Sequence, residues 1–128
     1  MNNIWQTATV IKGRKIAQKL GFPTANLENT FGMKDEQTGV YLCEVKPDNK
    51  NYFGLLYWGP RTAFGESENI LEIYIFDFSG NLYDKKVLFR ILERIRPVMD
   101  FPDLSILRKQ LKKDLQKARE LINQKRYE

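Results

Sequence analysis

The chain has 128 residues, a net charge of +5 and 42% hydrophobic residues, which is typical of one globular domain and not of a disordered chain. Its single cysteine and its lack of histidine exclude an internal disulfide, a Cys/His metal centre and a histidine-based catalytic triad. No apolar run approaches the roughly 20 residues of a membrane-spanning helix, and the first residues do not have the pattern of a signal peptide. We therefore expect a cytoplasmic protein that does not contact membranes.

The N-terminal third predicts one strand followed by a long loop. Residues 4–11 (IWQTATVI) are rich in β-branched residues, as strands are. Residues 12–26 contain a basic cluster, two glycines and a proline, and predict a loop with room for a helical turn at 14–19. The polar residues 27–38 continue this loop.

The middle of the chain predicts antiparallel strands joined by turns. Residues 39–46 (GVYLCEVK) alternate in polarity, and the turn signal at 47–51 joins them to a strand at 52–58. Further strands at 70–78 (ILEIYIFDF) and 85–95 flank a Ser-Gly-Asn turn. Short strands with turn signals and no long helix between them favour an antiparallel barrel or sandwich.

Residues 103–124 predict one long helix, with Asp103 as the N-cap after Pro102. Its charge is strongly basic, because residues 105–128 hold eight Lys/Arg and three Asp/Glu. The basic residues fall mostly opposite the apolar ones and no aromatic residue interleaves with them, so we interpret them as a solvated face and do not expect nucleic-acid binding. The apolar face recurs at intervals of three and four residues, as one side of a helix does: Leu104, Leu107, Leu111, Leu115, Ala118 and Ile122.

Two features can carry chemistry, and each has a structural alternative. Glu72 lies in the most apolar strand, where it either faces solvent or an arginine, or acts as a general base. Thr24 and Asn26 are two apart, so an extended backbone turns both side chains to one side, where they could supply oxygen ligands to Mg²⁺. Turn chemistry explains Thr24 and Asn26 equally well. The sequence matches neither GxxxxGK[ST] nor GxGxxG, which argues against a P-loop or a dinucleotide-binding enzyme.

Three motifs in the same order resemble the riboflavin kinase (flavokinase) family, including the C-terminal module of bacterial bifunctional riboflavin kinase/FAD synthetases. The resemblance runs from about Thr7 to Ile122 and implies a six-stranded antiparallel Greek-key barrel with a long C-terminal helix. It implies one domain over 1–128, with the barrel at about 4–101. It also implies transfer of the ATP γ-phosphoryl group to the ribityl 5′-hydroxyl of riboflavin, giving FMN and ADP. The motifs are LGFPTANLE, LEIYIFDFSGNLYDKKV and IRPVMDFPDLSILRKQLKKDLQKAR.

The resemblance implies roles for individual residues. Glu72 matches the family glutamate that takes the proton of the ribityl hydroxyl, and Thr24 and Asn26 would hold Mg²⁺ and the nucleotide phosphates. The ATP-binding residues that it implies are Gly13, Lys19, Gly21, Pro23, Thr24, Asn26 and Tyr83. The flavin-binding residues that it implies are Arg96, Met99, Phe101 and Leu104. Riboflavin and ATP are the expected partners of a monomeric enzyme.

Two other hypotheses stay open at this point. A flavin- or nucleotide-binding module with weak or lost catalysis would carry the same motifs, and Tyr74, where a histidine is common in the family, is one of several departures from the family pattern. A basic barrel that binds RNA or DNA would show salt-sensitive binding to a generic oligonucleotide. We expect no FAD synthesis, because nothing in these residues resembles the nucleotidyltransferase module of the bifunctional enzymes.

Overall fold

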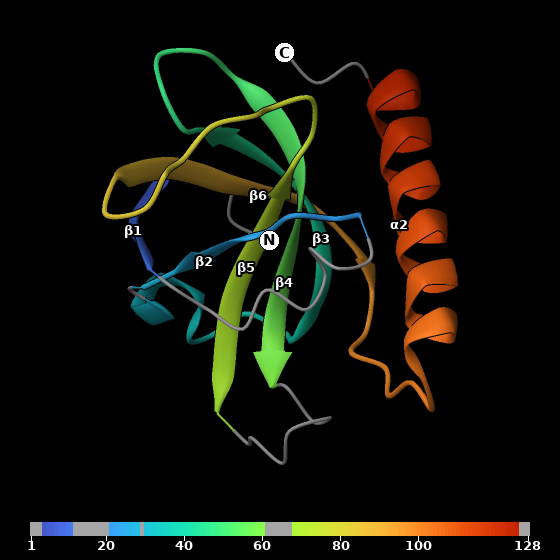
Figure 1. Cartoon of the computed structure of the whole chain (residues 1–128). Helices are drawn as coiled ribbons and strands as arrows, with labels where there is room; N and C mark the ends of the chain where they lie inside the picture. Colours follow the sequence, from blue (N-terminus) through green and yellow to red (C-terminus); the bar gives the residue numbers. More distant parts are fainter. Residues whose placement is uncertain (1–3, 12–20, 29, 61–67, 126–128) are drawn as a thin grey trace.

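The structure is a computed structural model that describes residues 4–11, 21–28, 30–60 and 68–125. Six strands close into an antiparallel barrel, and one long helix packs against its side (Figure 1). This architecture confirms the expected fold class. The elements are the strands β1 (Gln6–Ile11), β2 (Ala25–Leu27), β3 (Gly39–Lys46), β4 (Tyr52–Pro60), β5 (Asn69–Ile75) and β6 (Lys86–Arg96), the 3₁₀ turn η1 (Thr30–Met33) and the helix α2 (Leu104–Lys125).

The strands follow one another around the barrel in the order β1-β2-β5-β4-β3-β6, and every ladder is antiparallel. Strands β3, β4 and β5 form a meander, and β6 returns to lie beside β3, which is the Greek-key connection. The barrel closes where β1 pairs with β6, with Gln6 opposite Phe89. Strand β2 lies on the other side of the meander, between β1 and β5.

Strand β2 corrects the sequence prediction of a loop over residues 12–38. It is three residues long and is held by pairing on both sides, with Leu27 opposite Val10 of β1 and opposite Leu71 of β5. A segment this short gives no alternating pattern, because its strand conformation depends on partners far away in the chain.

The ends of the other predicted elements differ from the observed ends by at most three residues. The strand predicted at 70–78 ends at Ile75, because the chain turns at Asp77, whose φ is 59°. The predicted helix is confirmed at Leu104–Lys125, where the Ile106 N–H donates to Asp103 Oδ1 at 3.0 Å and so caps the first turn.

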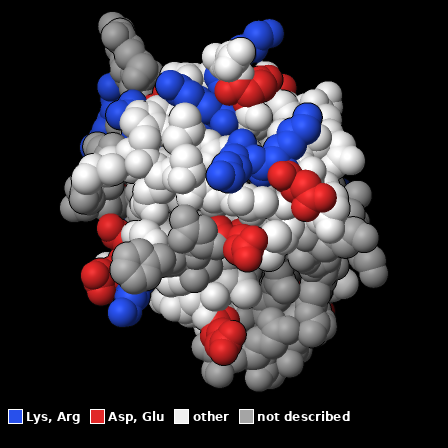
Figure 2. Space-filling model, turned by 90° about the vertical axis from the view of Figure 1, so that its left-hand side faces the viewer, with Lys and Arg blue, Asp and Glu red and all other residues white. Residues whose placement is uncertain are grey.

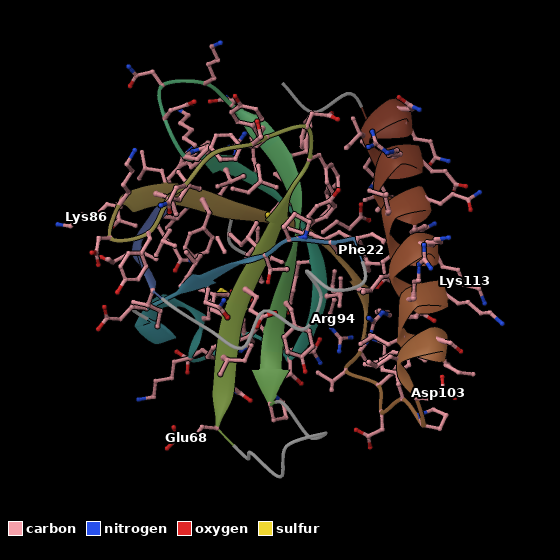
Figure 3. The ribbon with its side chains drawn as sticks, in the orientation of Figure 1. Phe22, Glu68, Lys86, Arg94, Asp103 and Lys113 are labelled. Carbon is pink, nitrogen blue, oxygen red and sulfur yellow. The ribbon has the colours of Figure 1, made fainter. Side chains whose placement is uncertain are left out.

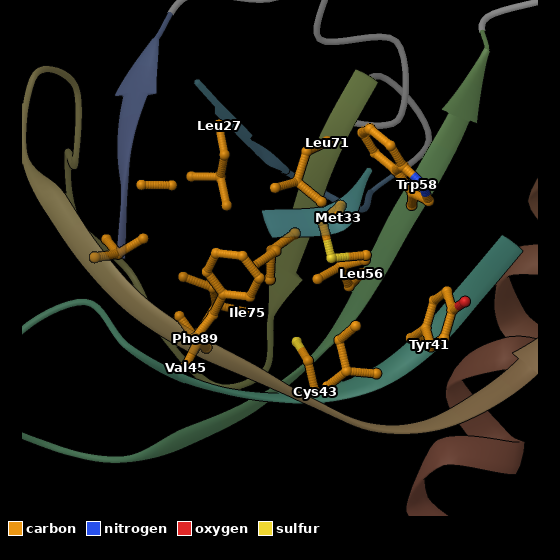
Figure 4. Packing of buried hydrophobic residues seen from close by; sticks show 14 of the residues in the cluster. Leu27, Met33, Tyr41, Cys43, Val45, Leu56, Trp58, Leu71, Ile75 and Phe89 are labelled. Atoms are coloured by element: carbon orange, nitrogen blue, oxygen red, sulfur yellow. The ribbon is translucent and has the colours of Figure 1, made fainter. Parts of the chain in front are cut away.

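Alternate residues of each strand point into the barrel and fill it (Figure 4). Met33 rises from η1 into the interior and packs with Leu56, Leu71 and other side chains that have no exposed surface or almost none. Because most of the interior is filled, any sizeable ligand has to bind at the mouth of the barrel or on its outer surface.

A second apolar cluster lies outside the barrel, between its wall and α2. Val40, Leu42 and Phe76 of the barrel side pack with Ala118 and Leu121 of the helix. Leu104, which was predicted on the apolar face, is 52% exposed because it lies at the very start of the helix. On the side of the barrel away from α2, basic and acidic side chains are interspersed (Figure 2).

Candidate functional site

A cleft of about 580 Å³ opens at the mouth of the barrel beside β2 and β5. Its walls are apolar side chains such as Val10 and Ile75, and its polar groups come from the Pro-Thr-Ala-Asn run and from the turn after β5. The cleft therefore joins two of the three motifs that were singled out in the sequence. Its lining residues are Val10, Ile11, Pro23, Thr24, Ala25, Asn26, Ile73, Ile75, Phe78, Ser79, Gly80, Asn81, Leu82 and Tyr83.

Thr24 carries a buried hydroxyl for which the described residues offer no hydrogen-bond partner. Buried polar atoms in folded proteins are almost always paired, so an orphan hydroxyl at the wall of a cleft points to a ligand atom that completes it. Asn26, which is 6% exposed, lines the same cleft from β2. The hydroxyl and amide oxygens of Thr24 and Asn26 are hard donors of the kind that Mg²⁺ prefers.

No group of three or more Asp, Glu, Cys or His side chains that could hold a metal occurs among the described residues. A metal held at Thr24 and Asn26 would thus take most of its ligands from water and phosphate oxygens. Mg²⁺ commonly binds in this way, because it gives up its waters reluctantly. The donor set fits a magnesium–nucleotide complex better than a metal bound by protein alone.

Glu72 lies directly beside Asn26. The two residues are register partners across β2 and β5, and directly opposed residues of antiparallel strands have Cβ atoms about 5 Å apart. The neighbours Leu71 and Ile73 point into the barrel, so the part-buried Glu72 side chain points outward. Glu72 itself does not line the cleft, but its partner Asn26 does.

The outer face of the barrel carries a continuous row of side chains through Glu72. Each member is the register partner of the next, and at about 4.8 Å per strand the row spans about 19 Å over its four steps. Its far end lies against α2, because the side chain of the last member contacts that helix. The row runs Asn26, Glu72, Tyr57, Val40, Arg96.

The structure places some of the residues expected to bind ATP at the cleft. Gly13 and Lys19 lie outside the described residues. Pro23 and Tyr83 line the cleft, and Tyr83 is 44% exposed at its rim, with its backbone N–H donating to Asn81 Oδ1 at 2.9 Å. Gly21 has a φ of 90°, a conformation that glycine adopts without strain, and lies just before the run.

Phe22 anchors the Pro-Thr-Ala-Asn run and is not predicted as a site residue from the sequence. Its buried ring meets Tyr74 edge-on at a centroid distance of 5.4 Å, and Tyr74 meets Phe76 in the same way at 5.6 Å. Figure 3 shows Phe22 on the side of the barrel that faces α2. This row of rings fixes where Thr24 lies relative to β5.

The residues expected to bind the flavin lie from the last residue of β6 to the first residue of α2. Arg96 Nε donates to Asp114 Oδ1 at 2.9 Å, and the Arg96 Cζ atom lies 5.7 Å from the centre of the Phe101 ring. Met99 and Leu104 are exposed nearby in the chain, at 43% and 52%. Arg96 and Phe101 are thus brought together, with apolar side chains in the same segment.

No helix among the described residues combines the length and the apolar character needed to cross a membrane.

A family model described as riboflavin kinase (flavokinase) matches residues 2–122. The RNA-binding riboflavin kinase RibR of Bacillus subtilis is 37% identical over 84% of the chain and 46% of its own length. The bifunctional riboflavin kinase/FMN adenylyltransferase of Haemophilus influenzae is 32% identical over 89% of the chain and 37% of its own. The chain spans less than half the length of these two relatives.

Among solved structures, riboflavin kinase from Trypanosoma brucei superposes with a TM-score of 0.67 at 20% identity. The match covers 93% of this chain and 79% of that one. The similarity shows that the two proteins share the fold.

Proposed function

We propose that this chain, which belongs to the riboflavin kinase family, transfers the γ-phosphoryl group of ATP to the ribityl 5′-hydroxyl of riboflavin and so forms FMN and ADP. The observation that carries the proposal is the pairing of Glu72 with Asn26, beside the orphan hydroxyl of Thr24. This arrangement sets a carboxylate that can accept a proton next to oxygen atoms that suit a metal-bound phosphate.

Phosphoryl transfer needs little covalent help from a protein, because most of the catalysis comes from positioning and from stabilising the developing charge. In the proposed reaction Glu72 accepts a hydrogen bond from the ribityl hydroxyl and then takes its proton as the oxygen attacks phosphorus. The outward direction of Glu72 suits this role, since the substrate has to reach it from the outer surface of the barrel.

The Thr24 hydroxyl and the Asn26 amide would hold Mg²⁺ together with the nucleotide phosphates. The metal supplies positive charge that offsets the charge of the transferred group. The apolar walls of the cleft, such as Val10, Ile75 and Phe78, suit the flat face of a nucleoside base. Tyr83 at the rim is in reach of the same ligand.

We propose that the flavin ring lies near Phe101, Met99 and Leu104. A flat, apolar ring binds well against aromatic and aliphatic side chains. The row from Asn26 to Arg96 supports this placement, because it joins the cleft to the segment that carries Phe101 along one face of the barrel. A ribityl chain that runs from this segment toward β5 would bring its terminal hydroxyl to Glu72.

The proposal is tested by incubating the chain with riboflavin, ATP and MgCl₂ and measuring FMN and ADP by chromatography. We expect FMN and ADP in equal amounts, and no FMN when ATP or Mg²⁺ is omitted. Tight flavin binding without FMN formation would instead support the alternative, a flavin-binding module without catalysis. Replacing Mg²⁺ with Ca²⁺ or Mn²⁺ tests which metal the site prefers.

We also propose that residues 1–128 act as one monomeric unit and that the basic face of α2 is solvated. Two of its cations have partners on the barrel side, since Arg119 lies over the Phe76 ring at 5.3 Å and Lys125 pairs with Glu93 at 3.4 Å. Size-exclusion chromatography tests the first point. Binding to a generic RNA that weakens with salt, and that is lost when Lys109, Lys112 and Lys113 become Gln, would contradict the second.

A further inference from the structure

Asp114 is an acidic residue on the basic helix α2, and it is 1% exposed. Its carboxylate accepts hydrogen bonds from three donors on two side chains. Arg96 Nε lies 2.9 Å from Oδ1 and Arg96 Nη2 lies 2.9 Å from Oδ2, while Gln110 Nε2 lies 2.9 Å from Oδ1. Burying a charge is costly unless it is paired and hydrogen-bonded in this way, so Asp114 holds Arg96 in one orientation.

The same guanidinium also contacts the segment between β6 and α2. Arg96 Nη1 donates to the carbonyl oxygen of Pro97 at 3.1 Å, and its Cζ atom lies 5.7 Å from the Phe101 ring centre. A planar guanidinium with a rigid set of donors can join several groups in a fixed geometry, which a lysine cannot do. Arg96 therefore ties the helix, the start of the segment and the Phe101 ring together.

A second contact holds the segment from the barrel side. A Cβ atom placed on Gly59 of β4 would lie 2.7 Å from Val98 Cγ2, closer than two carbon atoms can approach. Val98 therefore packs directly on the backbone of Gly59, beside the Tyr57 ring. The segment is held between β4 on one side and Asp114 on the other.

We propose that Asp114 is a positioning residue for flavin recognition, which acts through Arg96 to hold residues 97–103 in the conformation that binds the flavin ring. This inference rests on the proposed function. Asp114 would not touch the substrate. Its effect is preorganisation, because a segment that is already ordered loses less conformational entropy when the ligand binds.

A purely structural ion pair would tie α2 to the barrel and nothing more, and the two roles predict different kinetics. Loss of a structural tie lowers stability and affects ATP and riboflavin alike. Loss of a positioning contact raises KM for riboflavin and leaves KM for ATP unchanged, because the nucleotide cleft lies at β2 and β5. Hydrogen exchange of the amides of residues 98–101 reports the order of the segment without any ligand.

The test compares the full chain with Asp114→Asn, which keeps the size but removes the charge, and with Glu120→Gln, a matched control at an exposed acid of the same helix. We expect Asp114→Asn to raise KM for riboflavin about tenfold, the factor expected when one or two side chains have to be ordered on binding. In Asp114→Asn, the amide hydrogens of residues 98–101 should exchange faster, while the exchange rates of the amides in β3 should stay unchanged. Glu120→Gln should match the parent in every measurement.

Gln110→Met serves as the second variant, because it removes one donor to Asp114 and keeps the ion pair. If Asp114→Asn does not fold, the Gln110→Met variant tests the inference instead. We then expect a smaller rise in KM for riboflavin and a smaller increase in the exchange rate at residues 98–101. An unchanged KM for riboflavin in the folded variant, or an equal rise in both KM values, would overturn the inference. If the parent neither binds riboflavin nor forms FMN, the proposed function fails and the flavin role of Asp114 fails with it. Exchange at residues 98–101 then still shows whether Asp114 orders the segment.

Discussion

Asn26 lies directly opposite Glu72 in the ladder between β2 and β5, so that an amide and a carboxylate are neighbours on the outer face of the barrel. The pairing depends on register. A slip of β2 by one residue would turn Asn26 into the barrel and bring Ala25 or Leu27 opposite Glu72, because alternate residues of a strand point to opposite faces. The site therefore depends on a three-residue strand being held in place on both sides.

Glu72→Gln should lower the rate of FMN formation by about 10²–10⁴-fold, the usual contribution of a general base. Gln keeps the size and the hydrogen-bonding shape of Glu but cannot take the proton. Riboflavin binding, measured by the quenching of flavin fluorescence, should stay near the parent value. The control is Glu68→Gln at an exposed glutamate before β5, and a Glu72→Gln enzyme as fast as this control would remove the proposed base.

Thr24→Val should reduce turnover and raise the Mg²⁺ concentration needed for half-maximal rate, because it removes an oxygen from the proposed metal site. It should not lower the free energy of unfolding, since the Thr24 hydroxyl has no hydrogen-bond partner among the described residues. Steady-state kinetics measures the turnover and its dependence on Mg²⁺, and urea denaturation of the same sample measures the free energy of unfolding. Thr9→Val on β1, outside the cleft lining, is the control. Equal losses of riboflavin binding and turnover would mean that Thr24 is structural.

Cys43 should react very slowly with thiol reagents in the folded protein. Burial inside the barrel raises the pKa of its thiol, so the reactive thiolate does not form at neutral pH. Because the chain has one cysteine, labelling by a chromogenic disulfide reagent reports unfolding directly. The labelling rate should increase with urea in parallel with the loss of circular dichroism, and rapid labelling without urea would contradict the packing.

Asp103 should stabilise α2 at neutral pH, and this stabilisation should be lost in acid. Its carboxylate accepts a hydrogen bond from the Ile106 N–H, and with Ser105 this lowers its pKa below the ordinary value of 3.8. A lowered pKa in the folded state stabilises the fold above pH 3.8, and this contribution is lost as the pH falls through the folded value. Asp103→Ala should therefore be less stable than the parent at pH 7, with a difference that shrinks below pH 4. A difference that is independent of pH would exclude the cap.

Most of the barrel is predictable from the sequence because β3, β4, β5 and β6 are long enough to show a pattern. The strand residues that alternate, such as Leu71, Ile73 and Ile75, are those that point inward. Strand β2 is not predictable in this way, since its three residues follow a proline and become a strand only by pairing with β1 and β5.

For the candidate site, Asn26 and Glu72 are recognisable one by one, but their proximity is not. It follows from the β2–β5 register, which no local pattern contains. Asp114 could have been found, because it lies three residues after Leu111 and four before Ala118, on the apolar face of the helix. A lone charge on such a face indicates a buried partner. Phe22 has a weaker signal, an aromatic residue directly before the Pro-Thr-Ala-Asn run.

The seam between β1 and β6 has a consequence for how the chain is made. The ribosome releases the polypeptide from its N-terminus. The backbone groups of β1 that pair with β6 therefore stay unpaired until the residues around Phe89 emerge. An unpaired strand flank attracts other extended chains, so the interval before closure is when the nascent protein is most prone to aggregation. Slowing translation between Leu27 and Lys86 should therefore lower the soluble yield.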